Sequence, residues 1–441
     1  MKQMKEKISP VAGKLGALIR FATIAGEGED AAAFSGCREE MEKLYPKTAA
    51  ACERRLIAGR GVVWRWRGKS CEKPWVLMAH YDVVPPGETG WDRDPFCGEV
   101  ADGFVHGRGA LDTKGTLAAM LQAAEEMIEL GFTPPRDIFF CFSGDEETYG
   151  PTTGEIIRFL QENGQEPDFV LDEGGNMDTS PLSGFTGLAA MVGVAEKGMA
   201  QMRLVVTGPG GHASRPPRET QTDILVRAME RLRKSPWPMR FTPPVRACMR
   251  ALSFSCVFPW RLMYKYPDLY GTVLSARFEH DAGEKAALLR TTCALTQLSG
   301  SAAANVLPDV ASAGYNLRLL PGDTLEGVAE RARRIIHDSR VKVELAAGNE
   351  PSPVSETEGP AFERIRRAVT IVWPEAVTAP ALMIGATDAY YYSLFCPRVY
   401  RFSPLLVNAE ESAAVHAANE RVPVFSLLQA VAFYQALMAQ E

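Results

Sequence analysis

An apolar strand that runs directly into three acidic residues constrains this chain more than any other feature. Residues 138–142, Ile-Phe-Phe-Cys-Phe, have the composition of a buried strand, and Asp145, Glu146 and Glu147 follow after two intervening residues. Like charges held side by side cost free energy unless cations or protons compensate them. Taken alone, the run fits a solvated acidic turn as well as it fits a pair of metal-site residues.

The same arrangement recurs at two more predicted strands. Residues 75–79 lead into His80, and residues 168–171 lead into Asp172 and Glu173. Ligands of open α/β sheets bind at the carboxyl ends of the strands. We therefore expect these groups to meet in space, and the coincidence of three strand ends favours a functional site over a solvated turn.

Hydrophobic periodicity predicts the secondary structure of most of the chain. Helices are expected near 13–25, 31–44, 116–130, 153–163, 220–234, 324–338, 359–371 and 424–438, and strands near 62–66, 75–79, 137–143, 168–171, 202–207, 271–278, 312–319, 341–345 and 398–402. Strand–helix alternation predicts an α/β fold with a mostly parallel sheet covered by helices on both faces. From about residue 196, two β-α-β pieces predict a small α+β domain of the split βαβ, ferredoxin-like type. We expect a catalytic domain made of 1–195 and 350–441, with 196–349 inserted.

Charge and cysteine content exclude several classes of protein. The net charge of −6 argues against a nucleic-acid-binding protein, which would carry a basic patch or stripe. The nine cysteines form no CxxC pair and are odd in number, which predicts reduced thiols and a cytoplasmic protein. The N-terminus has no apolar signal core, and no run of 18 apolar residues occurs, so we expect no membrane segment.

The polar groups at strand ends and loops have the chemistry of a two-zinc site. Zinc takes imidazole and carboxylate ligands, and two neighbouring metals need a shared carboxylate. The chain offers five such ligands: His80, Asp112, Glu147, Glu173 and His416. Asp112 is the expected bridge because it lies in a tight glycine-flanked loop. Asp82 is placed to hold the second ring nitrogen of His80, and Glu146 remains free to act as general base.

The other histidines are weighed one by one. His212 lies in a glycine- and proline-rich loop, where the backbone can approach a ligand closely, and this favours function over a satisfied loop residue. His106 and His337 are expected to be structural, and His280 is expected at the surface.

Residues 236–270 are rich in Pro, Arg and aromatic residues and give no clear secondary-structure pattern. One interpretation is a loop-rich segment buried by its own aromatics or by a partner subunit, because large exposed apolar patches are uncommon on monomers. The other is an apolar wall for a greasy substrate.

Several motifs together resemble the dinuclear zinc exopeptidases, the family of carboxypeptidase S, carboxypeptidase G, aminoacylase, acetylornithine deacetylase and succinyl-diaminopimelate desuccinylase. The resemblance covers nearly the whole chain in the same order, and it rests on His80-Tyr81-Asp82-Val83-Val84-Pro85, Gly107-Arg108-Gly109-Ala110-Leu111-Asp112, Asp145-Glu146-Glu147, Leu171-Asp172-Glu173-Gly174 and His416. The loop 208–217 and the aromatic segment after 240 look most like the carboxypeptidase S branch.

The resemblance implies a role for each motif residue. His80, Asp112 and Glu173 would hold one zinc, Asp112, Glu147 and His416 the other, and Glu146 would be the base; Co²⁺ or Mn²⁺ could replace zinc. The inserted domain would act as a lid and form a homodimer. His212 would reach the partner's active site, Asn305 and Arg318 would contact substrate, and the Asp112–Thr113 peptide bond would be cis.

One position departs from the family pattern. Tyr390 stands where the family usually has an arginine that clasps the substrate carboxylate, and tyrosine supplies no charge. Arg318, Arg398 and Arg401 are the candidate replacements, and Tyr390 itself remains a candidate substrate contact.

These features predict a zinc-dependent metallopeptidase or amidohydrolase. It would cleave a peptide or N-acyl amide bond next to a carboxylate-bearing residue, as a carboxypeptidase or dipeptidase does. The alternatives are an N-acyl-amino-acid deacylase of the aminoacylase or acetylornithine deacetylase type, and a non-catalytic peptide-binding relative.

Overall fold

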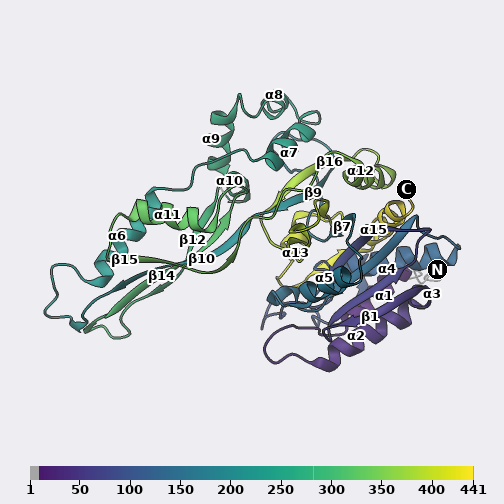
Figure 1. Cartoon of the computed structure of the whole chain (residues 1–441), viewed down its shortest axis with the longest axis horizontal. Helices are drawn as coiled ribbons and strands as arrows, with labels where there is room; N and C mark the ends of the chain where they lie inside the picture. The colour runs from purple at the N-terminus through teal and green to yellow at the C-terminus, as the bar shows by residue number, and fades with distance from the viewer. Residues whose placement is uncertain (1–8, 282, 441) are drawn as a thin grey trace, which may run out of the picture.

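The computed structural model describes residues 9–281 and 283–440. Figure 1 shows two lobes, a larger one around a central sheet and an elongated one around a second sheet. The two are joined where strand β9 (Ala189–Glu196) of the first sheet continues into β10 (Gly198–Thr207) of the second.

The central sheet has nine strands and is parallel in its middle. Its order is β1-β2-β6-β3-β7-β17-β9-β16, with β8 paired to β9. The neighbours β6, β3, β7 and β17 run parallel, whereas β1 and β2 are antiparallel at one edge. The other strands of this sheet are β1 (Cys52–Ile57), β2 (Gly61–Trp66), β3 (Ser70–His80), β6 (Arg136–Ser143), β7 (Phe169–Asp172), β8 (Met177–Asp178), β16 (Val377–Met383) and β17 (Val399–Arg401).

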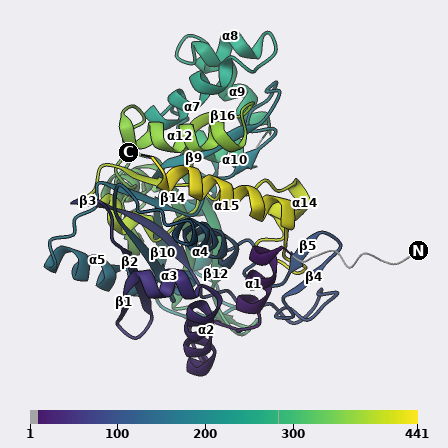
Figure 2. The same cartoon turned by 90° about the vertical axis from the view of Figure 1, so that its right-hand side faces the viewer.

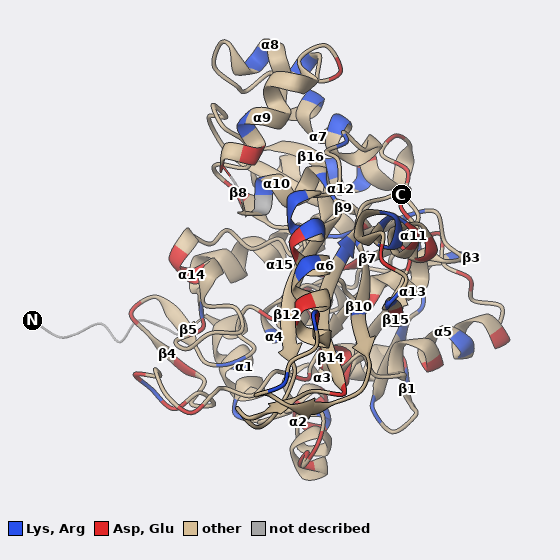
Figure 3. Cartoon of the chain, turned by 90° about the vertical axis from the view of Figure 1, so that its left-hand side faces the viewer, with Lys and Arg blue, Asp and Glu red and all other residues tan. Residues whose placement is uncertain are grey.

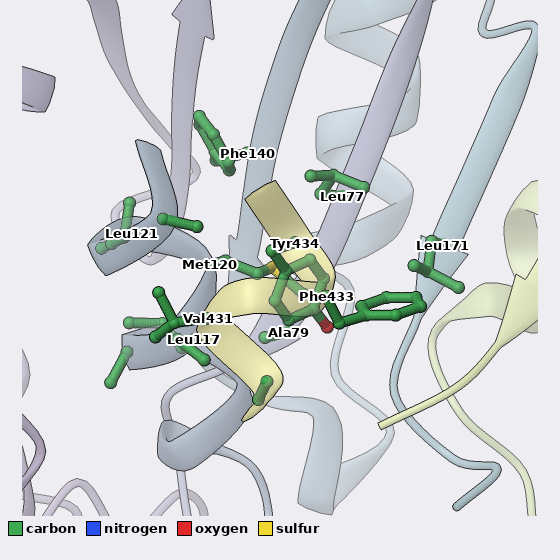
Figure 4. Close-up of a cluster of buried hydrophobic side chains, with 14 of the residues drawn as sticks. Leu77, Ala79, Leu117, Met120, Leu121, Phe140, Leu171, Val431, Phe433 and Tyr434 are labelled. Atoms are coloured by element: carbon green, nitrogen blue, oxygen red, sulfur yellow. The ribbon is translucent and has the colours of Figure 1, made fainter. Parts of the chain in front are cut away.

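Helices cover both faces of this sheet, which confirms the predicted α/β fold. Leu77 and Ala79 of β3 point to the face that carries α4 (Lys114–Glu129) and α15 (Val424–Met438), as Figure 4 shows. Figure 2 shows α15 lying beside α4. Val76 and Met78 point to the opposite face, where they pack with α5 (Thr152–Glu162) and α13 (Ala389–Ser393). Further helices of this lobe are α1 (Pro10–Ile19), α2 (Ala31–Leu44), α3 (Pro46–Ala51), α12 (Pro360–Val372) and α14 (Ala409–Ala413).

The second lobe has a four-stranded antiparallel sheet of order β12-β14-β10-β15. With α6 (Gln221–Lys234) after β10 and α11 (Leu325–Ile336) after β14, the strands and helices follow the β-α-β-β-α-β order of the split βαβ type. Alternate residues of β10, such as Met202 and Leu204, pack under both helices. The remaining strands are β12 (Thr292–Ser299), β14 (Val310–Leu319) and β15 (Val341–Asn349).

Four helices lie between α6 and β12, in the part of the chain whose pattern was unclear. They are α7 (Pro243–Ser253), α8 (Trp260–Lys265), α9 (Gly271–Asp281) and α10 (Gly283–Leu289). The strand predicted at 271–278 is wrong, because this stretch is the helix α9. Leu274 and Phe278, four residues apart, are its buried side chains, whereas Val273 is exposed. One helical turn separates two core residues, which overrides the β propensity of the Thr-Val-Leu run.

Short elements complete the described chain. They are β4 (Glu99–Ala101) and β5 (Phe104–His106), which form a sheet with β18 (Arg421–Pro423), the pair β11 (Gly211–His212) and β13 (Val306–Leu307), and a 3₁₀ turn over Glu146–Thr148. Basic and acidic residues are interspersed on the face in Figure 3. Among residues 9–281 and 283–440, no helix is long and apolar enough to cross a membrane.

Candidate metal centre

Three neighbouring strands deliver the polar groups to one edge of the central sheet. In the parallel pairings Leu77 lies opposite Phe140 on β6 and Leu171 on β7, so the three strands end side by side. His80 is the last residue of β3, and Glu173 follows β7 directly. This register explains why residues far apart in sequence meet at the carboxyl edge.

The first group of potential ligands contains His80, Asp112 and Glu173. His80 Nε2 lies 2.9 Å from Asp112 Oδ1 and 3.1 Å from Glu173 Oε1. The ligand atoms of all three lie within 4.8 Å of one another. The Asp112–Thr113 peptide bond is cis, in agreement with the family resemblance.

The second group contains Asp112, Glu147 and His416. His416 Nε2 lies 2.9 Å from Asp112 Oδ2 and 3.3 Å from Glu147 Oε1. Asp112 thus presents one carboxylate oxygen to each histidine and belongs to both groups. This is the geometry that a bridging carboxylate between two metals needs.

Glu146 belongs to neither group. Its Oε2 lies 4.0 Å from His80 Nε2, and Glu146 lines the same cavity as members of both groups. Burial raises the pKa of Glu146 to about 10, aided by Glu173 and Glu147 and opposed by His80. A carboxylate with this environment holds a proton readily.

Charge interactions perturb the other members strongly. Burial favours neutral His80, but Glu173, Asp112 and Asp82 outweigh it and raise its pKa well above the usual value. The adjacent carboxylates of Asp112 and Glu147 raise the pKa of His416 to about 10. Burial raises the pKa of Glu173 to about 7.

These residues fit divalent cations. Four carboxylates, those of Asp112, Glu146, Glu147 and Glu173, converge on two imidazoles, so protons or cations must compensate the crowded negative charge. The Oε1 atom of Glu147 is buried and has no hydrogen-bond partner within the described part of the chain. Imidazole and carboxylate are the donors that zinc takes in catalytic sites, and a pair of such cations would offset the like-charge cost.

Asp82 lies behind His80, at the position predicted from the sequence. His80 Nδ1 is 3.0 Å from the backbone carbonyl of Asp82 and 3.4 Å from its carboxylate. The carboxylate Oδ2 accepts a hydrogen bond from the Glu147 amide at 3.0 Å. Asp82 therefore contacts His80 of the first group and Glu147 of the second. Its backbone carbonyl lies closer to the His80 ring than its carboxylate does.

A buried carboxylate that the sequence did not reveal supports the Asp112 loop. Glu420 accepts hydrogen bonds from the amides of Gly109 and Leu111 and from the guanidinium of Arg108. No motif marks Glu420; its place four residues after His416 is the one signal in the sequence.

A cavity of about 310 Å³ opens over the two groups. Five predicted residues line it, namely Asp112, Glu146, Glu147, Glu173 and His416. Sequence reasoning missed the other polar side chains of its wall, Tyr149, Asn176, Thr387, Ser403 and Ser412.

The predicted substrate contacts do not line this cavity. His212 and Asn305 lie together on the second lobe, where the Ala213 amide donates to the Asn305 carbonyl at 2.9 Å. His212 is exposed, and its Nδ1 is 2.7 Å from Ser214 Oγ. Arg318 lies on β14 of the same lobe, and Tyr390 lies in α13.

Two of the arginines considered as replacements at Tyr390 are engaged elsewhere. Arg401 is fully buried and pairs with Glu196 at 2.7 Å. Arg398 pairs with Asp168 at the opposite end of the sheet, before β7 begins. Arg318, the third arginine considered, does not line this cavity.

The remaining histidines match their predicted roles only in part. His106 is buried on β5, where burial and Arg93 lower its pKa. His337 ends α11 in the left-handed conformation, with φ of 45°. His280 is exposed as predicted, but it lies on the helix α9 and not after a strand.

Comparison with known proteins identifies several related sequences. Residues 76–440 match the family model described as peptidase family M20/M25/M40. The N-fatty-acyl-amino acid synthase/hydrolase PM20D1 of Homo sapiens is 35% identical over 356 residues, which cover 80% of this chain and 71% of that protein. The probable carboxypeptidase S-like 2 of Dictyostelium discoideum is 32% identical over 412 residues, 91% of this chain and 78% of that protein.

Solved structures share the whole fold. The M20 family metallo-carboxypeptidase Sso-CP2 of Sulfolobus solfataricus superposes with a TM-score of 0.69 at 17% sequence identity. The matched region covers 98% of this chain and 99% of the Sso-CP2 chain. Human carnosine dipeptidase 1 has a TM-score of 0.65 at 14% identity, with 97% and 95% covered.

Proposed function

Since the chain belongs to peptidase family M20/M25/M40, as the motifs predicted, we propose that it is a two-zinc hydrolase of an N-acyl amino acid or a peptide. The chain is a metal-dependent hydrolase of peptide or N-acyl amide bonds. The proposal adds the metal, the number of ions and the carboxylate-bearing residue on one side of the bond. The observation that carries it is the pair of ligand groups that share Asp112.

His80, Asp112 and Glu173 would hold one zinc, and Asp112, Glu147 and His416 the other. When bound, the two ions would polarise the substrate carbonyl and lower the pKa of the attacking water. Cobalt or manganese could occupy the same donors.

Glu146 moves the proton in this proposal. Its carboxylate projects beside both groups without belonging to either, and it lines the cavity in which the substrate amide would lie. It takes a proton from water during attack and delivers that proton to the leaving nitrogen. Asp82 keeps His80 oriented.

A homodimer would complete the site. In this proposal, residues 196–349 are an inserted lid and dimerisation domain that brings His212 to the partner's cavity. His212 is exposed and absent from the wall of its own chain's cavity, which supports this role. Strand β12 is an edge strand with exposed Leu295 and Leu298, and an apolar edge of this kind is suited to pairing with a second copy.

We also propose a cytoplasmic location. All nine cysteines lie within the described residues, and all are free thiols. Reduced thiols are usual in the cytosol.

The Glu146→Gln variant tests the mechanism. It should lose at least about 10²-fold in kcat, because proton transfer contributes that much or more, and it should still bind two zinc ions per chain. Glu162→Gln, the same change at an exposed position of α5, is the control. Wild-type turnover by Glu146→Gln would exclude Glu146 as the base.

A substrate panel of N-acyl amino acids and dipeptides would separate the deacylase from the peptidase, and failure to cleave any of them would favour a binding protein.

A further inference from the structure

A second cavity, of about 290 Å³, adjoins the metal-centre cavity. Gly174 and Asn176 line both cavities. The loop after β16 does the same on the other side, since Gly385 lines the second cavity and Ala386 the first. The two hollows therefore meet at the loop that follows Glu173.

Most of the side chains that line this second cavity are apolar, with Asn176 and Asp178 as polar members of its wall. Its floor is formed by β9 and β16, with Met191, Leu382 and Met383. Its roof comes from the helices between α6 and β12, with Val245, Cys248 and Met249 on α7, Phe278 on α9 and Leu288 on α10. Figure 1 shows these helices above the ends of β9 and β16.

Polar side chains enter the second cavity near its junction with the first. Among the described residues of its wall, Asn176 is an amide and Asp178 is the charged side chain. Burial raises the pKa of the Cys248 thiol to about 12, so this side chain stays neutral at physiological pH. Against the side of the wall formed by Val245, Met249 and Phe278, a polar substrate group would lose its hydration without gaining partners.

We propose that this second cavity binds the hydrocarbon chain of a long-chain N-acyl amino acid, and that Met249 and Cys248 set the preferred chain length. The proposal rests on the proposed function, because the scissile amide must lie at the metal centre for the chain to extend past Gly174. Each cavity alone is at or below the lower end of the range of about 300–1,000 Å³ for ligand pockets, whereas the two joined fall well inside it.

The unclear segment of the sequence then has two roles. Its α7 side chains Val245 and Met249 form the apolar wall for substrate. Its α8 side chains pack on one another, with the rings of Trp260 and Tyr264 stacked at 5.6 Å. The expected loop-rich segment is helical, and it is only partly covered by its own aromatics, because Phe258 and Leu269 remain exposed. The wall for an apolar substrate is the role proposed here for α7.

An apolar void left by imperfect packing between α7 and the sheet is the competing explanation. Such cavities can stay dry and still admit apolar molecules. A void would not couple to turnover, whereas an acyl site must change the order of preferred substrates.

The test compares kcat/KM for acetyl, octanoyl, lauroyl and palmitoyl derivatives of one amino acid. Each methylene buried should raise kcat/KM by about fourfold until the cavity is full. Met249→Trp, which fills the cavity, should lower the ratio of palmitoyl to acetyl kcat/KM at least about tenfold. Met249→Ala, which enlarges it, should shift the optimum toward longer chains. Arg250→Trp, exposed on the same helix, is the matched control and should keep the wild-type ratio.

Binding of a fluorescent polyene fatty acid to metal-depleted protein gives a readout that needs no turnover. Wild-type protein should bind it, and Met249→Trp should bind at least about tenfold more weakly. If neither Met249 variant changes chain preference or fatty-acid binding while circular dichroism shows them folded, the acyl site is refuted. If the wild type cleaves no acyl amino acid but binds the fatty acid at Met249, the proposed function fails and the cavity assignment stands.

Discussion

Replacing Glu420 by glutamine would test how the shared ligand Asp112 is held in place. Oε2 of Glu420 accepts hydrogen bonds from Arg108 Nη1 at 2.6 Å and from the Gly109 amide at 3.1 Å. Its Oε1 accepts the amides of Leu111 at 2.8 Å and Asp112 at 3.3 Å. One carboxylate thus fixes the backbone around Asp112, the ligand common to both groups. In a glutamine side chain, the NH₂ group would replace one of these acceptor oxygens and would face N–H donors.

The expected loss of stability follows from the buried ion pair. Arg108 is 1% exposed, and its Nε and Nη2 have no hydrogen-bond partner among the described residues. Glutamine would leave the guanidinium without a counter-charge, which costs about 3–5 kcal/mol. At an unfolding entropy of about 2.1 cal/mol/K per residue, this lowers the Tm of a chain of 441 residues by about 3–5 °C. Zinc affinity should fall about 10–100-fold, as it does when a group that orients a metal ligand is removed.

Calorimetry would measure the Tm, and competition with a chromophoric chelator would measure zinc affinity. Glu125→Gln is the matched control. Glu125 is a buried carboxylate on α4 that accepts hydrogen bonds from the Lys47 amide and from the amide and hydroxyl of Thr48. This variant should lose stability and keep its zinc affinity. If Glu420→Gln bound zinc as tightly as the wild type, or if the control lost as much affinity, the supporting role of Glu420 would be refuted.

Three further outcomes are expected. Removing metal with a chelator should abolish turnover and lower the Tm, because the converging carboxylates lose their counter-charges, and added zinc should restore both; an unchanged Tm would contradict the charge argument. His212→Ala should cripple turnover and keep its zinc, and mixing it with Glu146→Gln should restore part of the activity by subunit exchange, whereas no recovery would count against a shared site. Burial lowers the pKa of Lys197 to about 7, so between about pH 7 and 10 the unfolded chain binds a proton that the folded chain has released. Stability should therefore rise with pH in that window, and chemical denaturation of Lys197→Met should show a flatter profile.

The ligand groups could be predicted from the sequence because a physical rule places them. Buried parallel strands read as apolar runs, and the residues that follow them converge at one edge. His80 and Glu173 are found in this way, from strand ends alone. His416 is harder, since it comes from a loop far along the chain and has a positive φ of 61°; the order of motifs in the family resemblance, not periodicity, placed it.

The supporting and substrate-facing parts could not be predicted in the same way. Glu420 acts through backbone amides, and any sequence can supply those, so no residue pattern marks its partners. Helices α8 and α10 have six and seven residues, which is too short for a helical period to stand out from the sequence. The strand predicted at 271–278 is wrong for a different reason. The two buried residues of α9 fit a helix, but the exposed Val273 between Thr272 and Leu274 made the run look β-rich.

The metal-ligand groups and the second cavity therefore depend on different parts of the fold. The metal groups depend on the register of β3, β6 and β7, in which a shift of one residue would point His80 away from Asp112. The second cavity depends on how α7 lies over β9 and β16, and a change of one side chain at Met249 alters its volume without moving a ligand. Chain-length preference should thus be adjustable by substitutions on α7 that leave zinc affinity intact. A substitution there that weakened zinc binding as much as Glu420→Gln would show that the metal-ligand groups and the second cavity are coupled, and would contradict this separation.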